Sequence, residues 1–260
     1  MFKGKIDSND TTATPERVFT LCKLLEKGAS TEDEIREMME PAYLGNSTRY
    51  FQYYKRTAED LGLITISDKT MDLAVDREVI KSTDNMRKYI NMHLEQFSGE
   101  HFYALTNAYF EIGNDIFKKE KNIANLGPFF SEITGKEIDA YSMRAWRFWV
   151  TFLGLGYLQD MFVIPNAYVF LRDVIEGSEL EKGKLYSASE FIQALSPMTN
   201  IIISNIQEKR FNYGTSNGLR ALQDAGIIRM EHILDQGDMW TLYPLKAYSN
   251  DSIITHITIV

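Results

Sequence analysis

The sequence predicts an α+β fold that is mainly helical and carries short β-hairpins. Apolar residues recur at helical spacing through most of the chain, whereas a few short runs change to the period of two that is typical of strands. An internal repeat is the third observation, because a helix, a glycine step and a strand-like run follow one another three times. The elements below are justified in chain order.

Residues 13–80 are expected to form the first unit, after a flexible N-terminus at residues 1–12. Local signals predict three helices and then a hairpin. In chain order they are the helix start Thr14-Pro15, the capping box of Thr31 and Glu34, the stop at Pro41, a third helix at about 47–61 and the hairpin turn Asp68-Lys69.

Residues 81–178 are expected to hold a helical connector followed by a second unit, and residues 184–260 a third. The polar, glycine-bearing stretch from Glu176 to Lys184 is the expected boundary between these last two units. A capping box of Ser187 and Glu190 marks the first helix of the third unit.

The repeat defines the three units. "STRYFQYYKRTAEDLGLI" begins at Ser47, and "SMRAWRFWVTFLGLGYL" begins at Ser142. Both start Ser-x-Arg, carry aromatic residues through the helix and end in Leu-Gly-hydrophobic. A shorter third copy, "SNGLRALQDAGII", begins at Ser216 and precedes a run that predicts a hairpin turning at Gly237.

Three helices followed by a β-hairpin is an order that resembles the winged helix-turn-helix superfamily, here repeated along one polypeptide. The resemblance implies tandem winged-helix domains joined by a helical linker. It also implies that the third helix of a unit is placed to enter the major groove of DNA. The chain is loosely similar in architecture to winged-helix accessory proteins of bacterial DNA-modification and defence systems.

The aromatic residues of these helices could pack in the core or contribute to a binding surface. Phe51, Tyr54 and Ala58 lie at i, i+3 and i+7, so we expect them to pack on the first two helices. Trp146, Trp149, Val150 and Leu153 are expected to be core in the same way. The arginines of these helices remain open between a solvated face, a protein contact and a DNA contact.

Cations and small polar residues cluster on the candidate recognition helices, although the whole chain has a net charge of −8 and a pI of about 5.1. Cations neutralise phosphates, and polar side chains can bond phosphates or base edges. The candidate DNA-binding residues are Asn46, Thr48, Arg49, Gln52, Lys55, Arg56, Arg144, Arg147, Lys209, Arg210, Thr215, Asn217 and Arg220.

No catalytic, metal or cofactor motif is recognised in the sequence. The four histidines are scattered, and the single cysteine, Cys22, excludes an internal disulfide and a thiolate cluster for zinc. The run "GLGYLQ" lacks the third glycine of a dinucleotide loop and follows a helix rather than a strand. The chain is therefore expected to be non-enzymatic and to need no cofactor.

Neither a signal peptide nor an apolar run long enough to cross a membrane is recognised, so a cytoplasmic protein without a membrane partner is expected. The leading hypothesis is a double-stranded DNA-binding protein that regulates transcription or serves a DNA-processing, modification or defence system. The alternative is a winged-helix adaptor that binds other proteins or a second copy of itself.

Overall fold

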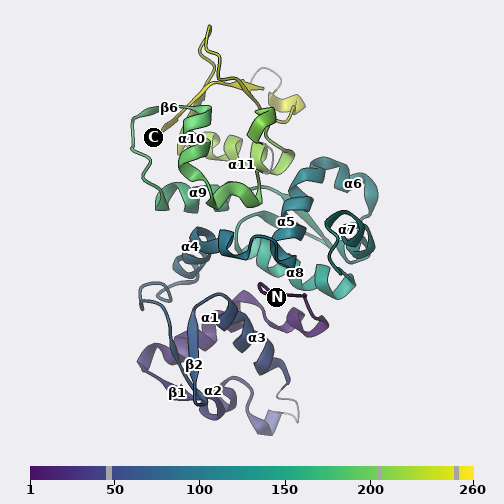
Figure 1. Ribbon diagram of the computed structural model, residues 1–260, viewed down its shortest axis with the longest axis vertical. Helices are drawn as coiled ribbons and strands as arrows, with labels where there is room; N and C mark the ends of the chain where they lie inside the picture. Colours follow the sequence, from purple (N-terminus) through teal and green to yellow (C-terminus); the bar gives the residue numbers. More distant parts are fainter. Residues whose placement is uncertain (45–48, 204–205, 249–251) are drawn as a thin grey trace.

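The computed structural model describes residues 1–44, 49–203, 206–248 and 252–260. Its helices and small antiparallel sheets are stacked in three tiers along the long axis of the molecule (Figure 1). The α+β class predicted from the sequence is confirmed. A single cluster of buried apolar side chains includes residues of all three tiers.

The lower tier follows the predicted order of three helices and a hairpin. Its elements are the 3₁₀ turn η1 (Ser8–Thr12), α1 (Pro15–Leu24), β1 (Ser30–Thr31), α2 (Glu32–Met39), α3 (Arg49–Asp60), β2 (Ile64–Ser67) and β3 (Thr70–Leu73). The strands form one antiparallel sheet in the order β1-β3-β2. The capping box of Thr31 and Glu34 is present, and the turn residues Asp68 and Lys69 both have positive φ, as a two-residue hairpin turn requires.

The expected flexible N-terminus is instead packed between the lower and middle tiers, where the N label lies in Figure 1. The side chain of Phe2 is fully buried, and its ring centroid lies 4.6 Å from that of Phe102 and 5.0 Å from that of Trp149. Trp149 also donates its indole N–H to the carbonyl of Ala13 at 2.7 Å. Burial of these apolar side chains outweighs the polar composition of the segment.

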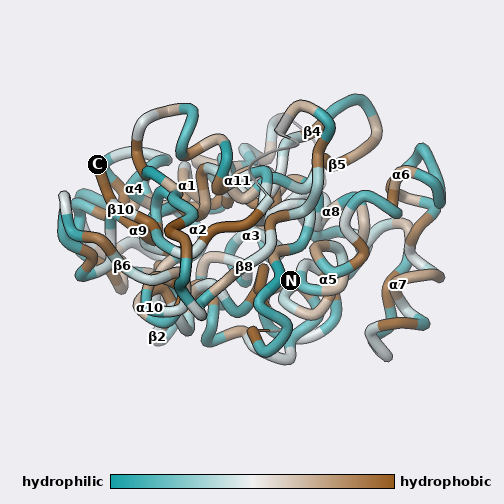
Figure 2. The backbone as a smooth tube through the Cα atoms, turned by 90° about the horizontal axis from the view of Figure 1, so that it is seen from above, coloured by the Kyte–Doolittle hydropathy of each residue, from teal (hydrophilic) through white to brown (hydrophobic). Residues whose placement is uncertain are grey.

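The middle tier begins with the connector helices. It contains α4 (Thr83–His93), α5 (His101–Ile112), α6 (Ile116–Lys119), the 3₁₀ turn η6 (Ile123–Leu126), α7 (Gly127–Thr134), α8 (Ala140–Phe152), β4 (Gly156–Gln159) and β5 (Phe162–Pro165). Strands β4 and β5 pair as a hairpin. Figure 2 shows hydrophobic and hydrophilic residues alternating along α7, which is the pattern of a helix with one buried face.

The upper tier contains the rest of the chain. Its elements are α9 (Tyr168–Gly177), β6 (Leu185–Ser187), α10 (Ala188–Leu195), α11 (Tyr213–Asp224), β7 (Ile228–Glu231), β8 (Trp240–Thr241), β9 (Ile253–Ile254) and β10 (His256–Ile259). One sheet has the order β6-β10-β7, and β8 pairs with β9 separately. The capping box of Ser187 and Glu190 is present at the start of α10.

The same backbone hydrogen bonds recur in all three tiers. The first amide of α2, η6 or α10 donates to the carbonyl just before the second strand of a pair: Glu32 to Lys69 at 2.9 Å, Ile123 to Met161 at 3.0 Å and Ala188 to Thr255 at 2.8 Å. Helices α3, α8 and α11 are each followed by a glycine with positive φ, namely Gly62, Gly154 and Gly226. The residue after that glycine donates back to the helix: Leu63 to Ala58, Leu155 to Val150 and Ile227 to Leu222. This pairing is a Schellman motif, so the repeat read from the sequence is a repeat of structure.

The predicted hairpin of the third unit is wrong. Strand β7 does not pair with the run after Gly237 but with β10, through partners such as Met230 and Ile257. The residues between β7 and β10 form an insertion that contains β8 and β9. Sequence reading favoured the nearer run because a glycine at a turn is a local signal, whereas the pairing of β7 with β10 is not.

Helix α9 lies just before the predicted boundary between the second and third units and packs on helices of two tiers. Helix α9 packs on α11, just as α1 packs on α3, so it takes the place of a first helix in the upper tier. It begins directly after β5, and the amide of Ala167 donates to the carbonyl of Gly214 at 3.1 Å. Because α9 also packs on α4, it links the middle and upper tiers, and the boundary at Glu176–Lys184 stays a prediction.

Candidate nucleic-acid interface

Helix α3 uses part of its polar face for contacts inside the lower tier. Lys55 Nζ and Gln52 Nε2 both lie 2.9 Å from Oε1 of Glu32 at the start of α2. The hydrogen bonds from Lys55 and then Gln52 lower the pKa of Glu32. The side chain of Lys55 is only 14% exposed, so this predicted DNA contact serves the packing of α2 on α3.

Arg56 is likewise paired within the chain. Its Nη2 lies 2.6 Å from Oδ1 of the buried Asp10 in η1, and its guanidinium lies 5.3 Å from the centroid of the Tyr53 ring. Tyr53 in turn accepts a hydrogen bond from Asn9 at 2.8 Å. The N-terminal segment thus lies along α3, although 44% of the Arg56 side chain stays exposed.

The remaining predicted contacts of the first unit cannot be placed. Asn46 and Thr48 lie outside the described residues. Arg49 is the first residue of α3, and its side chain lies outside the described part of the chain.

The two predicted arginines of α8 differ from Arg56 of α3. Arg144 is exposed and Arg147 is partly buried. Among the described residues, no carboxylate lies within ion-pair distance of either guanidinium. Arg147 Nη1 reaches the sulfur of Met161 at 3.9 Å, which is a weak acceptor. These two cations are thus not neutralised by described side chains.

Arg144 and Arg147 line a cleft where α8, η1 and the start of α3 meet. Its volume is about 600 Å³, and it is lined by Ser8, Asn9, Thr11, Thr12, Tyr50, Tyr141, Arg144, Arg147 and Phe148. A second depression of about 530 Å³ on α3 shares Asn9 with it and is lined by Asn9, Gln52, Tyr53, Lys55, Arg56 and Glu59. We call this continuous surface of η1, α3 and α8 the α3–α8 face.

Three predicted contacts of the third unit are turned inward, which removes them from the candidate surface. Thr215 is fully buried and donates to the carbonyl of Ile202 at 3.1 Å, and Arg220 is 3% exposed. Asn217 is partly buried, and its amide lies 3.4 Å from the carbonyl oxygen of Pro165. The face of α11 that was predicted to read DNA packs within the upper tier and on β5 of the middle tier instead.

Lys209 is also occupied within its own tier. Its Nζ lies 2.7 Å from Oδ1 of Asp238, which also accepts hydrogen bonds from the amide and hydroxyl of Ser189. Desolvation opposes the ionisation of Asp238, but the bonds from Lys209 and Ser189 dominate and lower its pKa to about 2. Lys209 therefore ties the segment before α11 to the loop before β8.

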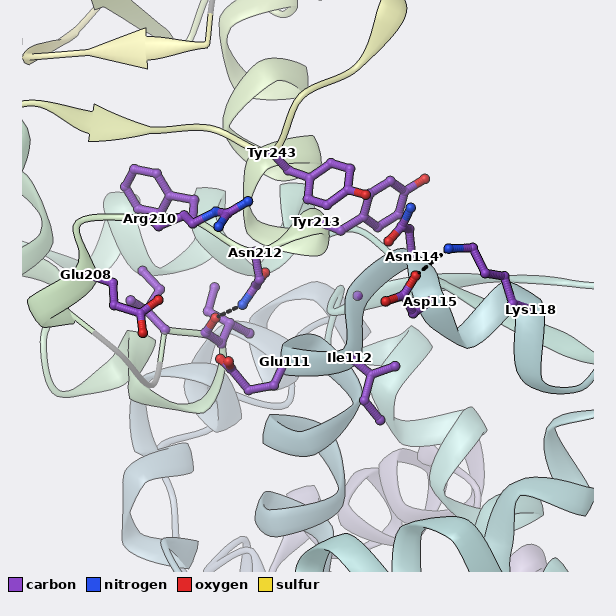
Figure 3. A pocket seen from close by; sticks show the side chains of 14 residues that line it. Glu111, Ile112, Asn114, Asp115, Lys118, Glu208, Arg210, Asn212, Tyr213 and Tyr243 are labelled. Carbon is purple, nitrogen blue, oxygen red and sulfur yellow. Dashed lines mark hydrogen bonds and ion pairs between the residues drawn. The ribbon is translucent and has the colours of Figure 1, made fainter.

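Arg210 is exposed and lies in a different cleft, between the middle and upper tiers. Figure 3 shows its side chain near Tyr243 and Asn212, with Glu111 across the pocket. This cleft of about 360 Å³ also contains Glu208 and the ion pair of Asp115 with Lys118. Three carboxylates in so small a space disfavour a phosphate, so the cleft is a poor site for a nucleic-acid backbone.

Sequence analysis did not identify the uncharged residues of the α3–α8 face. Ser8, Thr11 and Thr12 were assigned to a flexible end, and Tyr50 and Tyr141 were not named as candidates. One local signal was present, since Asp7 and Asp10 form a capping box that begins η1. By contrast, the core assignments of Phe51, Tyr54, Ala58, Trp146, Trp149, Val150 and Leu153 are confirmed by their burial.

Groups suited to other chemistry are sparse in the described ranges. Within these ranges, no three His, Cys, Asp or Glu side chains gather as a metal site would require, and no helix is long and apolar enough to span a membrane. Cys22 is buried, and desolvation raises the pKa of its thiol to about 12, which suppresses the thiolate. Comparisons with protein-family models, with curated proteins and with solved structures found no match to this chain.

Proposed function

We propose that this protein is a non-enzymatic, tandem winged-helix protein that binds double-stranded DNA through the α3–α8 face. The observation that carries the proposal is the pair Arg144 and Arg147. Both side chains lie in a polar cleft beside η1 and α3, and no carboxylate of the described chain is paired with them. Unneutralised arginines on one face are what phosphate binding requires.

The repeated architecture supports the winged-helix part of the proposal. Helices α3, α8 and α11, one in each tier, end at a Schellman glycine and lead into the first of two paired strands. Helices α3 and α8 hold equivalent positions in their tiers, and both border the same cleft. A duplex on the α3–α8 face would therefore meet two equivalent helices at once, which raises the affinity of two weak contacts through effective concentration.

The net charge of −8 is compatible with this role. Screening at physiological salt limits electrostatic effects to about 8 Å, so a local basic face can act on an acidic body. The acidic remainder disfavours indiscriminate coating of DNA. A regulatory or accessory role in DNA processing, modification or defence fits such a restricted contact, and the cytoplasm is the proposed location.

Salt-dependent DNA binding is the direct test. The double variant Arg144→Glu with Arg147→Glu should weaken duplex binding at least about tenfold and make the slope of log K against log salt shallower by about two. Fluorescence anisotropy at several salt concentrations measures both quantities. The matched control is Lys182→Glu, a charge reversal at an exposed lysine before β6, which should bind like the parent protein.

Unchanged binding in the arginine double variant, or no duplex binding even at low salt, would refute the proposal. Circular dichroism of each variant establishes that the fold is retained.

One observation favours an adaptor as the second candidate. The β4–β5 hairpin and the neighbouring α6 expose apolar side chains, among them Tyr157 at 52%, Leu158 at 44% and Phe117 at 42%. Exposed apolar groups of this kind are common at protein–protein contacts. If Leu158→Asp abolishes capture of one stoichiometric protein partner from a nuclease-treated extract and the DNA titration is negative, the adaptor replaces the DNA-binding proposal.

A further inference from the structure

The cleft of the α3–α8 face contains three aromatic rings that each have an arginine beside them. Arg17 lies 6.0 Å from the centroid of Tyr50, Arg144 lies 5.5 Å from that of Tyr141, and Arg147 lies 4.9 Å from that of Phe148. All three rings line the cleft. Tyr141 and Phe148 lie on α8 beside arginines of the same helix, whereas Tyr50 lies on α3 beside Arg17 of α1, so the fold brings the three pairs together in one cleft.

These rings are accessible. Tyr50 is 41% exposed and Tyr141 is 50% exposed, and Phe148 is partly buried. Contacts to a duplex backbone need cations and hydroxyls but no aromatic faces. Exposed rings in a cationic groove are instead the feature by which proteins stack unpaired bases, and the stacked arginines add cation–π attraction.

The hydroxyls of η1 complete a site for bases rather than for phosphates. Thr11 donates its hydroxyl hydrogen to the carbonyl of Ser8 at 3.0 Å, and Thr12 donates to the carbonyl of Asn9 at 2.7 Å. Their oxygens therefore remain acceptors, which suit the amino groups of bases but not phosphate oxygens. Phosphates, both of the duplex and of the strand that continues from it, are left to Arg144 and Arg147.

We infer that this cleft binds unpaired nucleotides, so that the preferred ligand is a DNA duplex with an adjoining single-stranded segment. The inference rests on the proposed function, because it assigns the duplex to the wider α3–α8 face and the unpaired strand to the cleft within it. A cleft of about 600 Å³ is the size of a small-molecule site, which fits a few nucleotides but not a duplex.

The experiment compares three DNA ligands on the full-length protein by anisotropy: a blunt duplex, the same duplex with a tail of about ten thymidines, and the tail alone. The parent protein should bind the tailed duplex more tightly than the blunt one. Tyr50→Ala with Tyr141→Ala should remove that gain, which amounts to roughly five- to a hundredfold per stacked base, so that this variant binds the tailed and the blunt duplex with similar affinity.

Two further variants control the experiment. Tyr141→Phe keeps the ring and should bind the tailed duplex like the parent protein. Tyr157→Ala removes an equally exposed tyrosine from β4, outside the cleft, and should change nothing.

The possible outcomes separate the inference from the proposed function. Equal affinity for blunt and tailed duplexes, or a tail effect that survives in the double alanine variant, overturns the inference and leaves duplex binding in place. Ring-dependent binding of the tail without any binding of the blunt duplex supports the inference and overturns the duplex proposal. Failure to bind any of the three ligands at low salt overturns both.

Discussion

At the scale of single residues, three carboxylates determine which predicted cations are available. Glu32 pairs with Lys55, Asp10 with Arg56, and Asp238 with Lys209. Each carboxylate stands more than 20 residues from its partner in the sequence, so the pairs form only when the chain folds. Some of the acidic residues of this protein therefore serve as ion-pair partners for its own cations.

The Asp238–Lys209 pair makes stability depend on pH. The pKa of Asp238 falls from 3.8 to about 2 on folding, so its contribution is complete above the unfolded pKa and is lost as pH falls from about 4 to about 2. Asp238→Asn should cost about 1 kcal/mol at pH 7, after allowance for solvent screening at this partly exposed pair. Urea unfolding at pH 7, 5 and 3 should find the difference from the parent protein shrinking at pH 3.

Asp235→Asn is the control for this measurement, because Asp235 belongs to the same loop and has no ion-pair partner among the described residues. A cost of Asp238→Asn that persists undiminished at pH 3 would show that the charge of Asp238 is not what stabilises the loop.

Residue types could be read from the sequence, but their partners could not. Arg56 and Arg144 look alike in the sequence, since each lies on a helix that is rich in aromatic residues. They differ only because η1 brings Asp10 to Arg56 while no described carboxylate reaches Arg144. Such differences arise from contacts between segments, and spacing along one helix does not contain them.

At the scale of elements, the repeated glycine is the most informative feature. Gly62, Gly154 and Gly226 adopt φ of +68°, +73° and +69° at the same step of the repeat. They differ in their surroundings, because a Cβ on Gly62 or Gly226 would meet open space. A Cβ on Gly154 would lie 2.4 Å from Cβ of Val169 and 2.9 Å from the amide nitrogen of Phe170.

Alanine at these three positions should therefore give unequal losses. Gly62→Ala and Gly226→Ala should each cost about 1–2 kcal/mol from backbone strain alone. Gly154→Ala should cost about 2–5 kcal/mol, since overpacking against α9 adds to the same strain. Chemical denaturation measures the three values, and an equal loss at all three positions would contradict the close approach of α8 and α9.

The elements that local chemistry defines were predicted well. The two capping boxes, the Asp68-Lys69 turn and the glycine stops depend on residues a few positions apart, which a sequence displays directly. The strand partner of β7 was predicted wrongly by the same approach. The glycine and polar residues of the insertion are typical of a hairpin turn, but β7 pairs with β10, which follows the whole insertion.

At the scale of the whole molecule, a buried ion pair joins the tiers. Arg87 on α4 donates from Nε to Oδ2 of Asp173 on α9 at 2.7 Å and from Nη2 to Oδ1 at 3.2 Å. Asn91 donates to the same carboxylate at 2.9 Å. The connector helix α4 is thereby fixed to α9, and the sequence analysis had placed both helices within residues 81–178.

Removal of this carboxylate should destabilise the molecule strongly. Asp173→Asn leaves the guanidinium of Arg87 buried without its main partner, at an expected cost of about 3–5 kcal/mol. Glu176→Gln on the same helix is the control, because the Glu176–Lys88 pair is exposed and should contribute less than about 1 kcal/mol. Urea unfolding followed by tryptophan fluorescence distinguishes the two variants. Similar losses of stability in both would argue against a stabilising role for the buried Arg87–Asp173 pair.

The separation of β10 from the rest of its sheet affects how a nascent chain folds. On the ribosome, the lower and middle tiers can complete their hairpins soon after β3 and β5 emerge. The sheet of the upper tier cannot form until residues 256–259 have been synthesised, although α9, α10 and α11 emerge earlier. During that interval β6 and β7 lack their common partner and present open edges. We therefore expect the upper tier to be the part of a newly made chain that depends most on chaperones.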